Sequence, residues 1–274
     1  MSSPDHSGER PYAGARSDNG GETLVSSPER SLLRPTPGGM REIEWTGAAG
    51  PFRLLLSPTV FAPTSTSRLV AEAMEIPPGA TVLDVGCGSG VLSFVAARKG
   101  AGRVVGCDAA PEAVADSRRN AERLGLSDRT EFRLGNLLEP VRDVKAQVVI
   151  GDVSGIPDRL AAASDWFPGG YAGGPTGSEI PVAMVETLGE CLDREGVMYL
   201  PTGTIQAENR VLAAARRVFG QNNMDEIVTR ELPLPTILAK SQALAQLVAE
   251  GLVNLRRRGS RLLWRITVWR CRRT

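Results

Sequence analysis

The sequence predicts an α/β fold in which a doubly wound, mostly parallel sheet carries helices on both faces. Short apolar runs alternate with amphipathic segments along the middle of the chain, a pattern typical of parallel strands joined by crossover helices. The first of these runs ends in a glycine-rich turn from which a helix begins. At the C-terminus, apolar residues partly alternate with Arg and Thr, which indicates an antiparallel strand pair.

The first half of the predicted sheet follows from short apolar runs that are bounded by turn residues. The run at 80–85 has the continuous apolar character of a buried parallel strand. Pro111 suits the first position of a helix, because its fixed φ and missing N–H cost nothing there. We expect strands at 80–85, 103–108, 130–134 and 146–150, and helices at 90–98 and 111–124.

The second half continues the alternation and ends in the antiparallel pair. Leu262, Trp264, Ile266 and Val268 are the alternating apolar residues of the last strand. We expect helices at 179–192, 207–219 and 238–250, and strands at 196–200, 224–232 and 261–271.

The chain divides into three parts by composition. Residues 1–40 contain seven Ser, six Gly and five Pro, and too few apolar residues to offset the entropy of ordering them. We therefore expect a disordered leader there, with a lid or a partner-binding arm as the alternative. Residues 41–78 are expected to form short strands and a helix that precede the core, and 79–274 to form the core domain.

Residue usage excludes several classes of site. The only histidine is His6, so a catalytic triad or a metal site with several histidines is not expected. The four cysteines are widely spaced, which suits a reducing compartment rather than a disulfide framework. No apolar run approaches about 18 residues, and the first residues lack a basic segment followed by an apolar stretch, so we expect neither a membrane span nor a signal peptide. We expect a cytoplasmic protein with no membrane partner and no metal.

The most informative segment is the glycine-rich loop at residues 82–90, VLDVGCGSG. Such a loop between strand and helix lets a ligand approach the backbone, and Asp108 at the end of the next strand is placed to bind ribose hydroxyls. A dinucleotide site needs a sixth-position glycine, where Val91 stands, and no lysine follows as in a P-loop. The loop therefore fits S-adenosylmethionine better than a dinucleotide.

With these motifs, residues 61–202 resemble the class I S-adenosylmethionine-dependent methyltransferases. The resemblance implies a Rossmann-like sheet of seven strands, mostly parallel with an antiparallel C-terminal strand. It also implies that the loop glycines pack against the methionine moiety, Asp84 orients its amino group through water, Asp108 holds the ribose and Asn136 faces the adenine. The implied cofactor-binding residues are Asp84, Gly86, Cys87, Gly88, Gly90, Asp108, Ala109, Asn136 and Leu137.

Within that class, the layout resembles the release-factor glutamine and ribosomal-protein methyltransferases. That group carries Asn-Pro-Pro-Tyr after the fourth strand, where this chain has Asp152 followed by VSGIP. The departure argues against transfer to glutamine or to a base nitrogen. Asp152 is our catalytic candidate, because a carboxylate can align or deprotonate a nucleophile. The alternative is that it only caps the following turn or helix.

Aromatic residues near this loop are candidates for the substrate pocket. Phe61, Trp166 and Tyr171 are expected to wall it, with packing in a core as the alternative. Asp158 and Glu179 are secondary acid candidates, and we favour solvated caps for both.

Charge is distributed unevenly along the chain. The net charge is +1, but residues 251–274 hold eight arginines and no acidic residue, which leaves −7 for the rest. Such an end indicates a nucleic-acid surface, a site for an acidic substrate or a solvated edge strand, and we favour the last.

The expected function is S-adenosylmethionine-dependent methylation of oxygen or nitrogen on a small metabolite or a peptide side chain. A small molecule or a peptide is the expected partner, and a nucleic acid is not favoured. The alternatives are a methyltransferase for rRNA or ribosomal proteins and a non-catalytic S-adenosylmethionine-binding scaffold.

Overall fold

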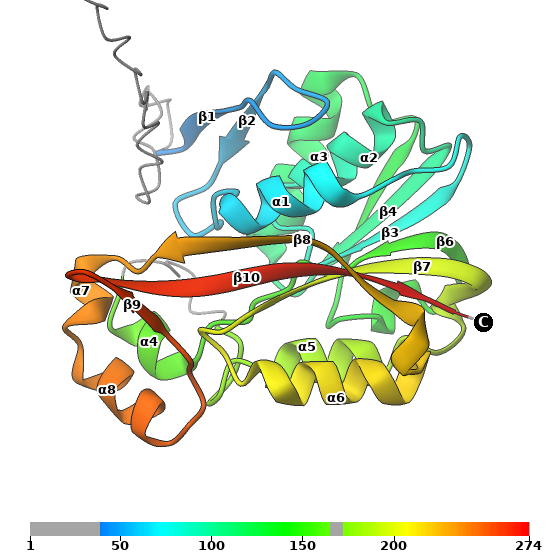
Figure 1. Cartoon of the computed structure of the whole chain (residues 1–274). Helices are drawn as coiled ribbons and strands as arrows, with labels where there is room; N and C mark the ends of the chain where they lie inside the picture. The colour runs from blue at the N-terminus through cyan, green and yellow to red at the C-terminus, as the bar shows by residue number, and fades with distance from the viewer. Residues whose placement is uncertain (1–38, 165–171, 274) are drawn as a thin grey trace, which may run out of the picture.

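The computed structural model describes residues 39–164 and 172–273, arranged around one mixed sheet (Figure 1). The order of its strands is β5-β4-β3-β6-β7-β10-β8, with the short β9 paired to β10. The strands are β3 (Thr81–Val85), β4 (Arg103–Asp108), β5 (Thr130–Leu134), β6 (Ala146–Ile150), β7 (Leu192–Gly203), β8 (Met224–Pro233), β9 (Arg256–Arg258) and β10 (Arg261–Arg272).

The parallel part of the sheet confirms the pattern of apolar runs. β3 pairs in parallel with β4 and β6, and β6 pairs in parallel with β7. Every residue of β3 after Thr81 is buried, because helices cover both of its faces. β10 runs antiparallel between β7 and β8, as expected for the C-terminal strand. The predicted fold class is confirmed, and β9 is an addition to it.

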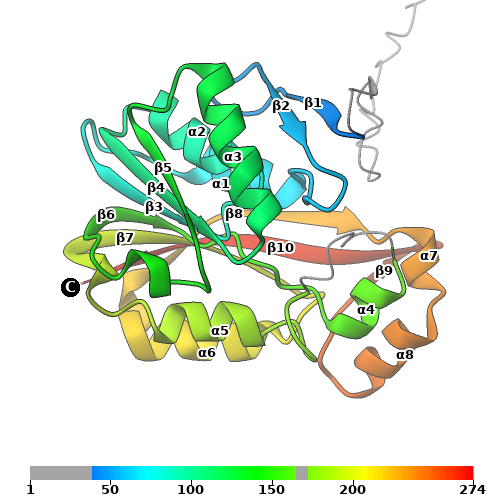
Figure 2. The same cartoon turned by 180° about the vertical axis from the view of Figure 1, so that it is seen from behind.

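Helices cover the sheet on both sides (Figure 2). On one face lie α1 (Ser65–Ala73), α2 (Val91–Arg98) and α3 (Pro111–Leu124), and on the other α5 (Glu179–Glu186) and α6 (Glu208–Phe219). Beyond the carboxyl ends of β6 and β8 lie α4 (Asp158–Ala162), α7 (Thr236–Ala239) and α8 (Gln242–Ala249). These last helices share a separate apolar cluster, made of Leu160, Ile205, Leu234, Leu238, Leu244, Leu247 and Val253.

Two predicted helices are shorter than expected. The helix expected at 179–192 ends at Glu186, and the chain turns at Gly189, whose φ of +47° leaves the helical region. β7 therefore begins at Leu192, earlier than expected. The helix expected at 238–250 is divided into α7 and α8, because the Ser241 hydroxyl accepts a hydrogen bond from Leu244 N and starts α8.

The N-terminal hairpin of β1 (Arg41–Trp45) and β2 (Phe52–Leu56) packs on α3 rather than forming a separate unit. Trp45 and Phe52 belong to the same apolar cluster as Phe94 of α2. The Asn120 side chain pairs with β2 like a neighbouring strand: its Oδ1 accepts from Leu55 N (2.8 Å) and its Nδ2 donates to Leu55 O (3.0 Å). α3 thereby fixes the hairpin on the sheet.

In the part of the chain that the structure describes, no helix is long and apolar enough to cross a membrane.

Replacement of Asn120 by alanine tests this attachment. The change leaves two backbone groups of β2 without partners, so we expect Asn120→Ala to lower the free energy of unfolding by about 2–4 kcal/mol. Urea denaturation followed by circular dichroism measures the loss. Asn254→Ala, at an exposed position, is the control and should change stability by less than about 0.5 kcal/mol. Equal stability of the two variants would contradict the role given to Asn120.

Candidate active site

Three carboxylates gather at the carboxyl edge of the parallel strands. Asp84 lies in β3, Asp108 ends β4, and Asp152 follows β6 by two residues. Because β3 lies between β4 and β6, the strand pairing brings all three acids to one place in the sheet. This edge is where open α/β sheets bind their ligands.

The glycine-rich loop begins where β3 ends. Gly86 N and Cys87 N both donate to Cys107 O, at 2.8 and 3.0 Å, which ties the loop to β4. Gly86, Gly88 and Gly90 have φ values of +72°, +53° and +83°. Other residues rarely adopt this left-handed conformation, so the glycines are required by the turn itself.

The three glycines face different surroundings. A Cβ at Gly90 would lie 2.7 Å from the Phe94 ring, so this glycine lets α2 pack closely. A Cβ at Gly86 would meet Val153 at 3.1 Å. At Gly88 the nearest atom would be a carbonyl oxygen of its own loop, 4.0 Å away. Of the three glycines expected to contact the methionine moiety, Gly88 is therefore the one with open space before it.

Asp108 is held rigidly by the backbone around it. Its Oδ2 accepts from Gly88 N and its Oδ1 from Ala110 N, both at 2.9 Å. Burial raises its pKa, and these hydrogen bonds partly offset the effect. Each oxygen keeps a lone pair for a further donor such as a ribose hydroxyl.

The other residues expected beside the cofactor lie at the same edge. Ala109 follows Asp108 and is exposed, and Asn136, just after β5, is also exposed. Leu137 has a φ of +48°, and its carbonyl oxygen accepts a hydrogen bond from the Cys107 thiol at 3.0 Å. The exposed Asn136 side chain is free of the core and available to a ligand.

Asp84 is the most deeply buried of the three acids. It is 1% exposed, and Ser93 Oγ donates to its Oδ2 at 2.6 Å. Burial raises its pKa to about 7, the Ser93 hydrogen bond opposes the rise, and the charges of Asp152 and Asp108 add to it. Asp84 therefore changes its charge close to neutral pH.

Cys87 lies in this loop and is one of the residues implied to bind the cofactor. Its side chain is buried, and burial raises the thiol pKa well above the usual value, with the nearby Asp108 and Asp84 charges adding to the rise. The thiol stays neutral, which is the opposite of what a nucleophile needs.

Asp152 is bound by the first turn of α1. Ser67 Oγ donates to its Oδ2 at 3.0 Å, across 85 positions of sequence. Burial raises the Asp152 pKa to about 6, and the Ser67 hydrogen bond lowers it in part. α4 begins six residues later with Pro157 at its N-cap and no side-chain cap, so Asp152 does not cap that helix.

Sequence reasoning did not single out Ser67. It occupies the third position of a capping box in which Thr64 is the N-cap, and this local pattern was the available signal. The pattern explains why a serine starts the helix, but not that its hydroxyl reaches Asp152.

Two more polar residues beside this loop were missed. Ser154 Oγ and Gln206 Nε2 are buried and have no hydrogen-bond partner among residues 39–164 and 172–273. Gln206 is 6% exposed, and a side chain at Gly155 would collide with its amide oxygen. Buried polar groups without partners are rare in folded proteins, so these two are available to a bound substrate.

The residues expected to wall the substrate pocket are only partly described. Phe61 is 38% exposed in the segment between β2 and α1, whereas Trp166 and Tyr171 lie outside the described residues. Asp158 accepts a hydrogen bond from Gly174 N at 3.1 Å, as a loop cap does.

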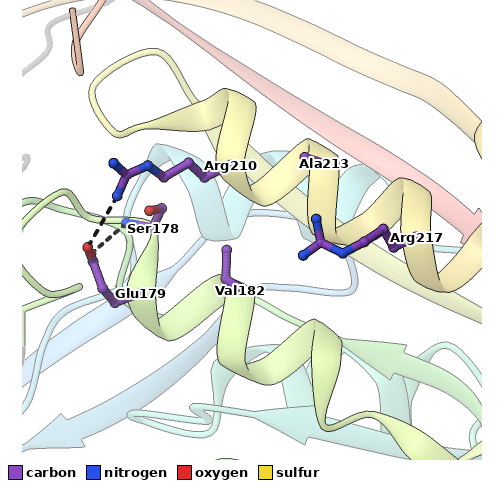
Figure 3. Close-up of a pocket in the computed structure, with 6 residues that line it drawn as sticks. All are labelled: Ser178, Glu179, Val182, Arg210, Ala213 and Arg217. Atoms are coloured by element: carbon purple, nitrogen blue, oxygen red, sulfur yellow. Dashed lines mark hydrogen bonds and ion pairs between the residues drawn. The ribbon is translucent and has the colours of Figure 1, made fainter.

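Glu179 belongs to a different place, a shallow groove between α5 and α6 (Figure 3). Its carboxylate accepts from the Ser178 and Thr176 N–H groups and pairs with Arg210 at 3.9 Å. The groove has a volume of about 330 Å³ and is lined by Ser178, Glu179, Val182, Arg210, Ala213 and Arg217. None of its lining residues comes from the glycine-rich loop or the three acids.

Fold and site together define a Rossmann-like domain with a cluster of acids at the carboxyl edge of its parallel strands. Residues 76–164 match the family model of a methyltransferase domain. Two ribosomal protein L11 methyltransferases are similar to the chain. That of Pelotomaculum thermopropionicum is 44% identical over 112 residues, covering 40% of this chain and 35% of its own. That of Escherichia coli is 43% identical over 84 residues, covering 31% and 28%.

A 16S rRNA N2 methyltransferase of T. thermophilus, solved with AdoMet and guanosine, has a similar fold. Its TM-score is 0.53 at 16% identity, over 88% of this chain and 52% of that one. The expected resemblance to class I S-adenosylmethionine-dependent methyltransferases is confirmed, and the expected cofactor agrees with it. The chain covers about a third of the length of its curated relatives.

The expected partners are wrong. We expected a small molecule or a peptide and disfavoured nucleic acid, but the similar curated proteins are ribosomal protein methyltransferases, and a neighbour in fold methylates rRNA. The expectation was wrong because the basic end was interpreted as a solvated edge strand, and the local sequence does not show which of its arginines are ion-paired.

The buried acids predict how stability depends on pH. The unfolded carboxyl of Asp84 ionises near pH 3.8, but the folded one only near 7, so folding takes up a proton between these values and stability falls as pH rises through them. The raised pKa of Asp152 likewise makes stability fall as pH rises. We expect Asp84→Asn to remove part of this fall and to raise Tm at about pH 8 by roughly 3–6 °C, with little change near pH 4.

Differential scanning calorimetry across this pH range measures the effect. The only histidine is His6, so histidine titration contributes little to the result. Asp128→Asn, at an exposed aspartate, is the control for Asp84→Asn. Its stability should depend on pH as that of wild type does. An Asp84→Asn curve parallel to wild type would contradict the raised pKa.

Proposed function

We propose that the protein is an S-adenosylmethionine-dependent methyltransferase that modifies an amino nitrogen of a ribosomal protein. The observation that carries the proposal is the Asp152 carboxylate, held by Ser67 beside the glycine-rich loop. The similarity to ribosomal protein L11 methyltransferases supports the substrate class.

The residues present fit the donor. Gly88 leaves its side of the loop open, and the Asp108 carboxylate has lone pairs directed by two backbone hydrogen bonds. Asn136 offers an exposed amide at the same edge of the sheet. Asp108 would hold the ribose, Asn136 the adenine and Asp84 the amino group of the methionine moiety. When bound, S-adenosylmethionine supplies an electrophilic methyl group on a sulfonium.

The task left to the protein is alignment of the acceptor and removal of its proton. An aliphatic amine is protonated at neutral pH, with a pKa of about 10.4, and must lose a proton before it can attack. Asp152, with a pKa of about 6, is ionised at pH 7 and can bind the ammonium group and accept the proton. A hydroxyl group is far less acidic than an ammonium group, so this carboxylate is a better base for a nitrogen acceptor than for an oxygen acceptor.

Ser154 and Gln206 are the candidate groups for positioning the acceptor. Both present unpaired buried polar atoms beside the loop that follows Asp152. A donor N–H at Gln206 and a hydroxyl at Ser154 can bind a backbone carbonyl or a side-chain amide of the substrate.

Loss of the Asp108 carboxylate tests donor binding. We expect Asp108→Ala to weaken S-adenosylmethionine binding by roughly 100-fold or more, because hydrogen bonds to a charged group contribute about 1.5–3 kcal/mol each. Isothermal titration calorimetry measures the affinity. Asp128→Ala, far from this edge at the start of β5, should bind like wild type. Wild-type affinity in Asp108→Ala would sink the ribose assignment.

Loss of the Asp152 charge tests catalysis separately. We expect Asp152→Asn to keep S-adenosylmethionine affinity within about threefold, but to reduce kcat at least 100-fold with a ribosomal protein acceptor. In wild type, kcat/KM should fall about tenfold per pH unit below the Asp152 pKa of about 6, and the variant should lose this limb.

Radiolabelled methyl transfer into ribosomal proteins measures both quantities. Asp158→Asn changes the neighbouring exposed acid of α4 and is the control, expected to stay within about twofold of wild type. An Asp152→Asn enzyme with unchanged kcat would show that the carboxylate is not the base.

A further inference from the structure

The eight arginines of the C-terminal end differ sharply in their surroundings. Five of them are already engaged within the protein. Arg256 pairs with Glu231, Arg265 with Glu208, Arg270 and Arg272 with Asp225, and Arg273 donates to the carbonyls of Gly189 and Leu192. These five therefore stabilise the sheet rather than offer charge to a partner.

Arg257, Arg258 and Arg261 form no ion pair within residues 39–164 and 172–273, and all three are exposed. They lie on the hairpin that joins β9 and β10, which turns at Gly259 with a φ of +60°. We call these three residues the arginine tip. The nearby acid Glu231 pairs with Arg256, so no acid among the described residues forms an ion pair with the tip.

The strand pairing places two of these charges against each other. Arg258 and Arg261 are direct cross-strand partners in the β9–β10 ladder. Like charges in such a pair lie about 5 Å apart at Cβ and destabilise the hairpin. An anion that binds both guanidinium groups would convert this repulsion into attraction.

The arginine tip lies at the same end of the sheet as the candidate active site, beyond the carboxyl ends of the parallel strands. β10 is antiparallel to β7 and β8, so its first residues extend past their carboxyl ends, beside α4, α7 and α8 (Figures 1 and 2). The strand pairing relates Asp152 to a position along β10. Asp152 lies two residues after Ile150, Ile150 pairs with Tyr199 of β7, and Tyr199 pairs with Arg270 near the other end of β10. At about 3.3 Å per residue along β10 and about 4.8 Å between strands, the tip is roughly 25–30 Å from Asp152.

At this distance the arginine tip cannot contact a small acceptor bound at Asp152. A substrate that contacts both places must therefore be a polymer. Three guanidinium groups close together on one short hairpin match the closely spaced phosphates of a polynucleotide better than the irregular placement of carboxylates on a protein surface. Arginine presents its donors in a planar fork that can bind two phosphate oxygens at once.

We propose that the arginine tip, Arg257, Arg258 and Arg261, binds the phosphate backbone of an RNA segment and thereby docks the enzyme on a ribonucleoprotein substrate. The proposal deepens the proposed function and rests on it only for the identity of the methyl acceptor. RNA binding by the tip can be measured without any turnover.

The test compares two variants of the full chain with equal loss of charge. Arg258→Gln/Arg261→Gln removes the cross-strand pair, and Arg53→Gln/Arg194→Gln removes two exposed arginines from β2 and from the first residues of β7. The probe is a fluorescein-labelled oligouridylate of about 30 nucleotides, followed by fluorescence anisotropy at about 50–200 mM KCl. Polyglutamate of similar length is the competing anionic probe.

We expect Arg258→Gln/Arg261→Gln to weaken RNA binding at least fivefold, and to reduce the slope of log K against log salt by about 1–2. The control variant should stay within about twofold of wild type. Equal losses in both variants, or no loss in either, would overturn the proposal, as would a loss for polyglutamate without one for RNA. Aggregation of the tip variant with unchanged RNA affinity would show that the arginines only protect an edge.

S-adenosylmethionine affinity is measured on the same samples. A tip variant that binds the donor normally and RNA weakly supports the docking role. Absent donor binding in wild type would instead refute the proposed function and leave the RNA result intact.

Discussion

Three carboxylates at one edge of the sheet impose the constraint on which the rest of the structure depends. Asp108 and Asp152 lie close enough to Asp84 to raise its pKa, and burial raises the pKa of all three carboxyls. Each is held by a different donor: the Ser93 hydroxyl, the loop amides around Asp108, and the Ser67 hydroxyl. The cluster is costly to stability, and such cost is typical of sites arranged for binding and catalysis.

The segment before the core serves the same edge. α3 presents the buried polar residues Asp116, Ser117 and Asn120. Asp116 accepts from Ser57, Asn120 pairs with β2, and Ser117 donates to the carbonyl oxygen of Gly88. One helix thus fixes both the N-terminal hairpin and the glycine-rich loop. The hairpin in turn leads to α1, whose first turn carries the partner of Asp152.

Charge has two separate uses at the C-terminal end. Four of its eight arginines pair with acids on β8 and α6, which explains how a basic segment lies against an acidic body. The arginine tip is the exception, since its charges are exposed and two of them repel. The distance between the tip and Asp152 separates docking from chemistry, as suits a large substrate.

Sequence alone determined the alternation of strands and helices, the glycine-rich loop, and the positions of Asp84, Asp108 and Asp152 at strand ends. These features depend on apolar runs and spacings within about 30 residues, which a linear pattern records. Only the tertiary structure decided that Ser67 holds Asp152, 85 residues away, and that Asn120 holds β2, 65 residues away. It also decided which arginines are neutralised, because strand order and register place residues such as Arg270 and Asp225 together, and neither can be read from local sequence.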